Sequence, residues 1–251
     1  QAMPFIADIP RVQAERRADE IAFWFEGQST SFGELERRSN QVANGLIGHG
    51  VEPGDRVAYL AKNTDAYYEM LFGCAKARAV MTGVNTRLAA PEIQFILADS
   101  KARVLFVGKE FYSIIDQIRD ELPDLMRVIT IDGDRDYYPS WRNSKPASAP
   151  GLTPLSDDDV IQLYTSGTTG KPKGVQLTNA NYNAFFRQAA MLDWSSYAAG
   201  EAVMNAMPLF HVAGVNVGVL AAAQGAKTVV LREIDPTAIL KLIPEHKIAH
   251  A

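Results

Sequence analysis

The sequence is short of cysteine and of positive charge, and it has no apolar run long enough to span a bilayer. One cysteine in 251 residues, Cys74, excludes an internal disulfide framework and is typical of a reducing compartment. A net charge of −4 leaves no basic surface of the kind that nucleic acid requires. The most apolar stretch, residues 212–223, is too short for a transmembrane helix. With no signal-peptide pattern at the N-terminus, these absences predict a cytoplasmic protein without a nucleic-acid partner, and they leave peripheral membrane contact open.

What the sequence does have is a repeated alternation of short apolar strands with helices. At 47% hydrophobic residues the chain can bury a large core, and Cys74 falls on an apolar helix face inside it. Alternation of this kind predicts the α/β class, with doubly wound, mostly parallel sheets sandwiched by helices. The expected strands are 56–60, 80–84, 104–107, 127–131, 160–164, 175–177, 203–207 and 227–231. The expected helices are 31–50, one capped by Asn63 or Thr64, 92–98, about 111–119, from Thr178 or Asn179 to about Trp194, 212–224 and 236–243.

Residues 132–159 interrupt this alternation. They are rich in aspartate, proline, serine and glycine, which predicts a long polar connection between a subdomain of about 1–131 and a second of about 160–251. Three consecutive aspartates, 157–159, could suggest a metal site, but a solvated entry into the next strand is the preferred interpretation. The sequence therefore predicts two subdomains and no metal ligand.

The most informative segment is 164–175, Tyr-Thr-Ser-Gly-Thr-Thr-Gly-Lys-Pro-Lys-Gly-Val. Glycines let the backbone approach an anion closely, hydroxyls donate hydrogen bonds, and lysine supplies a point charge for phosphate. The spacing is neither that of a Walker A motif nor that of a dinucleotide fingerprint. The candidate phosphate-binding residues are Thr165, Ser166, Gly167, Thr168, Thr169, Gly170 and Lys173.

This segment closely resembles the phosphate loop of the adenylate-forming superfamily, which includes acyl- and aryl-CoA synthetases, firefly luciferase and peptide-synthetase adenylation domains. A second match is the Pro-Leu-Phe-His segment, 208–211, which in that family lies beside the acyl pocket. A third is 85–93 with Asp99-Ser100, interpreted as structural, with Arg87 pairing or capping. The resemblance covers about Pro10 to the end of the chain and favours the fatty-acid–CoA ligase branch.

The resemblance implies ATP, magnesium and coenzyme A, with a carboxylic acid, most simply a fatty acid, converted to an acyl-adenylate and then to a thioester. It assigns Lys173 and His211 to catalysis, with Lys173 at the family's usual lysine position and Lys171 as a solvated neighbour. His211 is expected beside the carboxylate but not as a general base, since a carboxylate is already ionised at pH 7.

Several family motifs have no counterpart within these 251 residues: the Thr-Glu magnesium motif, the ribose-binding aspartate, the hinge arginine and the C-terminal lysine. We expect them beyond Ala251, in a missing C-terminal half of the same enzyme, so this part alone should be inactive. The alternatives are an aryl-CoA ligase, a non-catalytic nucleotide-binding fragment and, least favoured, a structural or interaction domain.

Overall fold

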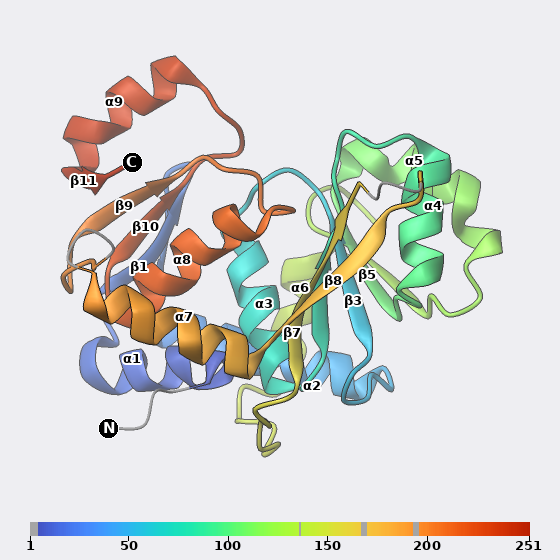
Figure 1. Cartoon of the computed structure of the whole chain (residues 1–251), viewed down its shortest axis with the longest axis horizontal. Coiled ribbons are helices and arrows are strands. Elements are labelled where there is room, and N and C mark those ends of the chain that lie inside the picture. Colours follow the sequence, from blue (N-terminus) through green and yellow to red (C-terminus); the bar gives the residue numbers. More distant parts are fainter. Residues whose placement is uncertain (1–4, 136, 167–169, 193–195) are drawn as a thin grey trace.

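The chain forms two sheets with helices between them and on both outer faces (Figure 1). The structure is a computed structural model that describes residues 5–135, 137–166, 170–192 and 196–251. Its strands are β1 (Ile21–Phe25), β2 (Gln28–Ser31), β3 (Arg56–Leu60), β4 (Val80–Gly83), β5 (Val104–Val107), β6 (Arg127–Thr130), β7 (Asp159–Thr165), β8 (Lys173–Thr178), β9 (Ala202–Asn205), β10 (Lys227–Val230) and β11 (Ile248–His250). Its α-helices are α1 (Ile9–Arg17), α2 (Phe32–Gly48), α3 (Ala66–Lys76), α4 (Ala90–Asp99), α5 (Tyr112–Ile118), α6 (Tyr138–Asn143), α7 (Asn179–Met191), α8 (Val212–Gln224) and α9 (Pro236–His246).

The predicted α/β class, with mostly parallel sheets between helices, is confirmed. One sheet has the order β11-β9-β10-β1-β2 and the other β6-β5-β3-β4-β7-β8, and only the β1–β2 and β7–β8 pairs are antiparallel. In Figure 1, α3 and α8 lie between the sheets, α9 covers the outer face of the first, and α4 and α5 lie on the far side of the second. Strands β4 and β5 are buried along their whole length, which accounts for their unbroken apolar sequences.

Strand order does not follow chain order. β1 and β2, which the sequence did not predict, join the sheet of β9–β11, whereas β7 and β8 join β3–β6. The five-stranded sheet therefore combines strands from the two ends of the chain, whereas the six-stranded sheet is built from its middle, residues 56–178. The division into about 1–131, 132–159 and 160–251 stays a prediction about folding units.

The predicted cap of α3 is wrong by one or two residues. Asp65 is the cap and accepts a hydrogen bond from the Ala66 amide at 3.0 Å. Thr64 instead lies 3.2 Å from the Tyr59 hydroxyl, and Asn63 bonds a distant loop. Both residues are buried, so tertiary partners take the place of the local cap.

Residues 132–159 are not merely a polar connection. They contain α6, whose Trp141 packs so closely on α2 that a Cβ at Gly45 would lie 2.4 Å from the indole. The Trp141 indole N–H also donates to His49 Nε2 at 2.8 Å. One aromatic turn in a polar segment has no periodicity to detect, which is why the sequence did not predict α6.

The buried position predicted for Cys74 is confirmed, and the helix expected over 31–50 corresponds to α2. Cys74 is fully buried, and burial raises the pKa of its thiol. Ser31 caps α2 through a capping box, in which its hydroxyl accepts from the Glu34 amide at 3.1 Å and its amide donates to the Glu34 carboxylate at 2.9 Å. None of the helices in the described ranges combines the length and apolar character needed to cross a bilayer.

Candidate functional site

Residues 164–165 end β7 and residues 173–175 begin β8, and the two strands pair as an antiparallel hairpin. Thr165 pairs with Lys173, and Tyr164 pairs with Gly174, so the loop projects beyond the carboxyl end of β7. Gly170 has a φ of +83°, in the left-handed region that glycine adopts without strain. The carboxyl ends of parallel strands are the usual place for ligands in open α/β sheets.

A cleft of about 690 Å³ lies between this hairpin, α4 and the loop that precedes α8. Its lining residues are Gly83, Asn85, Leu88, Pro91, Glu92, Phe95, Ile96, Tyr164, Thr165, Ser166, Gly170, Lys171, Pro172, Phe210 and His211. The structure thus brings Thr165, Ser166 and Gly170 to the same cleft as His211, although they are separated by some forty residues of sequence. We call it the hairpin cleft.

Three predicted residues cannot be placed. Gly167, Thr168 and Thr169 lie outside the described residues. Of the two lysines, Lys171 lines the hairpin cleft, with its Nζ 6.0 Å from the centre of the Phe95 ring. Lys173 begins β8 and is exposed, and it is not among the residues that line the cleft. The choice of Lys173 over Lys171 therefore stays a prediction from the resemblance.

His211 occupies the N-cap position of α8 and is exposed to the cleft, with its ring centre 4.6 Å from that of Phe210. The loop 206–211 reaches β4 because Gly83 has no side chain, since a Cβ there would lie 3.0 Å from the Phe210 Cα. The sequence indicated His211 but not what holds it.

Two buried asparagines hold that loop. Asn63 donates to the Met207 carbonyl at 2.8 Å, and its own carbonyl accepts from the Leu209 amide at 3.0 Å. Asn205 donates to the Gly214 carbonyl at 2.8 Å. Asn63 is 144 residues from Met207 in sequence, so no local signal could have revealed this role.

The segment 85–93 contributes to the same cleft through Asn85, Leu88 and Glu92. The backbone amide of Arg87 donates to the Asn85 side chain at 2.9 Å. Within the described ranges no ion pair of the Arg87 side chain is found, so the predicted pairing is not observed there.

Two of the three aspartates at 157–159 form ion pairs within the fold. Asp158 forms two hydrogen bonds of 2.8 Å with the Arg78 guanidinium, which lowers the pKa of the carboxyl. Asp159 lies 3.3 Å from Arg56. Across the described residues there is no group of three or more histidine, cysteine, aspartate or glutamate side chains that could hold a metal ion.

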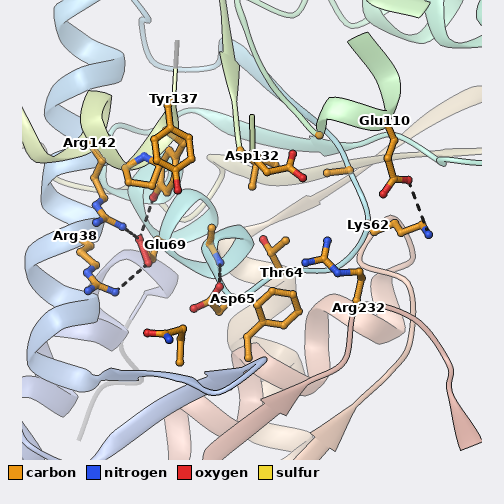
Figure 2. Close-up of a pocket in the computed structure, with 18 of the residues that line it drawn as sticks. Arg38, Lys62, Thr64, Asp65, Glu69, Glu110, Asp132, Tyr137, Arg142 and Arg232 are labelled. Carbon is orange, nitrogen blue, oxygen red and sulfur yellow. Dashed lines mark hydrogen bonds and ion pairs between the residues drawn. The ribbon is translucent and has the colours of Figure 1, made fainter. Parts of the chain in front are cut away.

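A second, more polar cleft of about 350 Å³ opens beside α3 and α6, and Figure 2 shows its charged side chains. At its left wall Glu69, almost fully buried, accepts from Arg142 at 2.6 Å and from the Tyr138 hydroxyl at 3.0 Å, and Arg38 lies 3.6 Å away (Figure 2). We call it the polar cleft. Its left wall is a buried charge cluster that sequence analysis did not find, because its members come from three separate helices.

Asp65 lies in the polar cleft, where burial and the neighbouring Glu69 charge raise the pKa of its carboxyl to about 6, against the opposing effect of Arg38. The folded protein therefore binds a proton here more tightly than the unfolded chain does, so this group lowers stability as the pH rises from about 4 to about 6. We expect Asp65→Asn, which keeps the α3 cap, to stabilise the fold by roughly 2–3 kcal/mol at pH 8 and by little at pH 4.

Urea unfolding at the two pH values measures this difference. Asp235→Asn is the matched control, since Asp235 also caps a helix, α9, but at an exposed position. Equal effects of Asp65→Asn at pH 4 and pH 8 would contradict the assignment.

Comparison with known proteins places these features in a family. A family model described as AMP-binding enzyme matches residues 10–251. The chain is 40% identical over 195 residues to a fatty acid–[acyl-carrier-protein] ligase of Streptomyces coeruleorubidus, covering 76% of this chain and 36% of the relative. It is 36% identical over 224 residues to a feruloyl-CoA synthase of an Amycolatopsis species, covering 88% of this chain and 43% of that protein.

A long-chain-fatty-acid–CoA ligase of Mycobacterium tuberculosis is 32% identical over 221 residues, covering 87% of this chain and 43% of that protein. Among solved structures, the N-terminal domain of FACL13 from Mycobacterium tuberculosis superposes with a TM-score of 0.90 at 29% identity, covering 98% of this chain and 62% of that one. The chain therefore spans 36–43% of the length of these three curated relatives.

Proposed function

This chain belongs to the AMP-binding enzyme family, and from that premise we propose that it is the N-terminal part of an acyl-CoA ligase. In this proposal the chain supplies the phosphate-binding hairpin and part of the acyl site. The observation that carries it is the hairpin cleft, where Thr165, Ser166 and His211 line one cavity. The 251 residues alone are expected to be inactive.

In the first half-reaction, a substrate carboxylate oxygen attacks the α-phosphorus of ATP. A bond forms between that oxygen and phosphorus, the bond to the bridging oxygen breaks, and pyrophosphate leaves. Positioning and charge neutralisation dominate such a step. Thr165, Ser166 and Gly170 would hold the β- and γ-phosphates, with Gly167, Thr168 and Thr169 completing the loop and Lys173 supplying positive charge.

In the second half-reaction, the coenzyme A thiolate attacks the acyl carbon, and the bond to the adenylate oxygen breaks as AMP leaves. His211 would pack beside the reacting acyl group at the other side of the cleft. It has no proton to remove in the adenylation step, because the carboxylate is ionised near pH 7.

Among the residues that the structure describes, no three histidine, cysteine, aspartate or glutamate side chains gather in a group that could hold a metal ion. Magnesium is expected to arrive with ATP, and no step is assigned to it on this chain.

A fatty acid is the leading substrate, in line with relatives named as ligases of fatty acids. An aryl acid is the second candidate, because another relative is named as a feruloyl-CoA synthase and a structural neighbour, at 26% identity, as an anthranilate CoA ligase. The alternative to both ligase functions is a nucleotide-binding module without catalytic activity.

Carboxylate-dependent ATP–pyrophosphate exchange by the product of the whole gene tests the proposal. A panel from acetate to palmitate, with benzoate and coumarate, separates the two acid classes. Exchange with fatty acids supports the leading proposal, and exchange with aryl acids alone replaces it by the second. ATP binding without any acid-dependent exchange would leave only the nucleotide-binding module.

The two loop lysines provide a sharper prediction. We expect Lys173→Ala to reduce exchange roughly 10- to 100-fold by removing a charge-assisted contact worth about 1.5–3 kcal/mol. Lys171→Ala is the matched control, two residues away, with an expected loss below about threefold. The assignment fails if Lys173→Ala exchanges like the wild type, or if the larger loss follows Lys171→Ala.

A further inference from the structure

A row of hydrogen-bonded side chains crosses the six-stranded sheet and ends beside the hairpin cleft. Arg56 Nε donates to Gln162 Oε1 at 2.8 Å, and Gln162 Nε2 donates to the Tyr164 hydroxyl at 3.0 Å. Tyr164 in turn donates to Asp99 Oδ2 at 2.6 Å. The row joins β3, β7 and the last residue of α4.

Every bond in this row runs in the same direction, from a cationic donor at one end to a carboxylate at the other. Such chains are mutually polarising, and the short bond to Asp99 is charge-assisted. Partial burial and the Asp99 charge raise the pKa of Tyr164, so its hydroxyl stays protonated at neutral pH and remains the donor. Asp159 closes the other end of the row, 3.3 Å from Arg56.

The opposite strand of the hairpin leaves room for this row. Gly174 pairs with Tyr164, and a Cβ on it would lie 2.7 Å from Gln162 Nε2 and 3.4 Å from Tyr164 Cζ. Gly174 does not have a positive φ, so the space beside the row, and not an unusual backbone, is what glycine provides here.

Tyr164 lies where the row of hydrogen bonds meets the hairpin cleft. Tyr164 immediately precedes Thr165, the first candidate phosphate-binding residue, and Asp99 belongs to α4, which forms the facing wall of the cleft. The Tyr164–Asp99 bond therefore ties one wall of the hairpin cleft to the other. Lys171 also approaches the facing wall, with its Nζ 6.0 Å from the centre of the Phe95 ring.

We propose that Tyr164 is a positioning residue, which fixes the β7–β8 hairpin against α4 through Asp99 and Gln162 and so sets the affinity for the triphosphate of ATP. This inference rests on the proposed function only for the identity of the ligand. The structural claim, that the Tyr164 hydroxyl holds the hairpin in place, does not depend on the proposed function.

Tyr164→Phe tests the inference, because it removes the hydroxyl and keeps the ring. We expect hydrogen exchange of the amides in 160–165 and 173–177 of the 251-residue chain to accelerate 5- to 10-fold. In the exchange assay on the whole gene product, the KM for ATP should rise 5- to 10-fold while kcat stays within twofold. Asp99→Ala should have the same effects, and the double variant should lose no more than either single variant.

Two further variants separate positioning from general damage. Asp99→Asn retains an acceptor for the hydroxyl and should recover most of the loss seen with Asp99→Ala. Tyr112→Phe is the matched control, since Tyr112 donates a 2.6 Å bond to the Asp132 carbonyl beyond β6, at the opposite edge of the same sheet. It should leave both the hairpin amides and the KM for ATP unchanged.

The inference is overturned if Tyr164→Phe leaves the hydrogen exchange of the hairpin amides unchanged, whether or not the KM for ATP changes. A changed KM with unchanged hairpin amides would mean that the hydroxyl touches ATP directly. If the wild-type gene product shows no ATP-dependent activity, the proposed function fails, while the hydrogen-exchange comparison still decides whether Tyr164 holds the hairpin.

Discussion

Gly214→Ala is expected to displace the loop that carries His211 and to reduce exchange activity at least tenfold. A Cβ at Gly214 would lie 2.4 Å from the Pro208 carbonyl oxygen and 3.0 Å from that of Met207. Both are backbone atoms that cannot rotate away, and Asn63 and Asn205 hold this loop from both sides. Overpacking at such a site costs about 1–3 kcal/mol of folding stability.

Gly48→Ala is the matched control. Gly48 is also helical, but a Cβ there would meet nothing within 4 Å, so alanine should be neutral or stabilising by up to about 1 kcal/mol. Urea unfolding and ATP–pyrophosphate exchange on both variants measure the contrast. If Gly214→Ala retains wild-type stability and activity, the close contact between the start of α8 and Pro208 is not what positions His211.

Glu69→Ala is expected to destabilise the fold by about 3–5 kcal/mol, because it removes the carboxylate that pairs with both Arg142 and Arg38 in the buried cluster of Figure 2. The Tyr138 hydroxyl, also buried, loses its acceptor at the same time. Leaving a buried cation and a buried hydroxyl unpaired costs much more than the bonds themselves contribute.

Glu110→Ala serves as the comparison within the same cleft. Glu110 lies 3.8 Å from Lys62 in a pair that water reaches, and removing an exposed pair of this kind costs about 1 kcal/mol or less. Chemical unfolding of both variants at one pH measures the two costs. If Glu69→Ala costs no more than Glu110→Ala, the cluster around Glu69 is not a structural ion cluster.

Local patterns predicted most of the secondary structure. The capping box of Ser31 and Glu34, the proline in the first turn of α4 and the glycine after α8 are short-range signals, and these helices begin and end near the expected residues. Apolar runs such as 56–60 and 104–107 are strands because both faces of a parallel sheet are buried. The cap of α3 was mispredicted because Asn63 bonds a distant partner, Met207.

The candidate site also contains residues that the sequence indicated and residues that it did not. Its loop and its Pro-Leu-Phe-His segment were evident from residue types in sequence, and the structure places Thr165, Ser166, Gly170 and His211 on one cleft. Three residues hold these groups: Asn63, Asn205 and Asp99. Their side chains form hydrogen bonds with residues as far as 168 positions away, and such pairings leave no trace in a single sequence. The Glu69 cluster, drawn from α2, α3 and α6, is hidden for the same reason.

The central claim is that the β7–β8 hairpin binds the phosphates of ATP. Hydrogen exchange of the 251-residue chain with and without pyrophosphate tests it most directly, because pyrophosphate carries the charge that the hairpin should recognise. The account predicts protection of the amides in 164–166 and 170–174, and none at 62–69 beside the polar cleft. Protection at the polar cleft alone, or no protection at millimolar pyrophosphate, would contradict it.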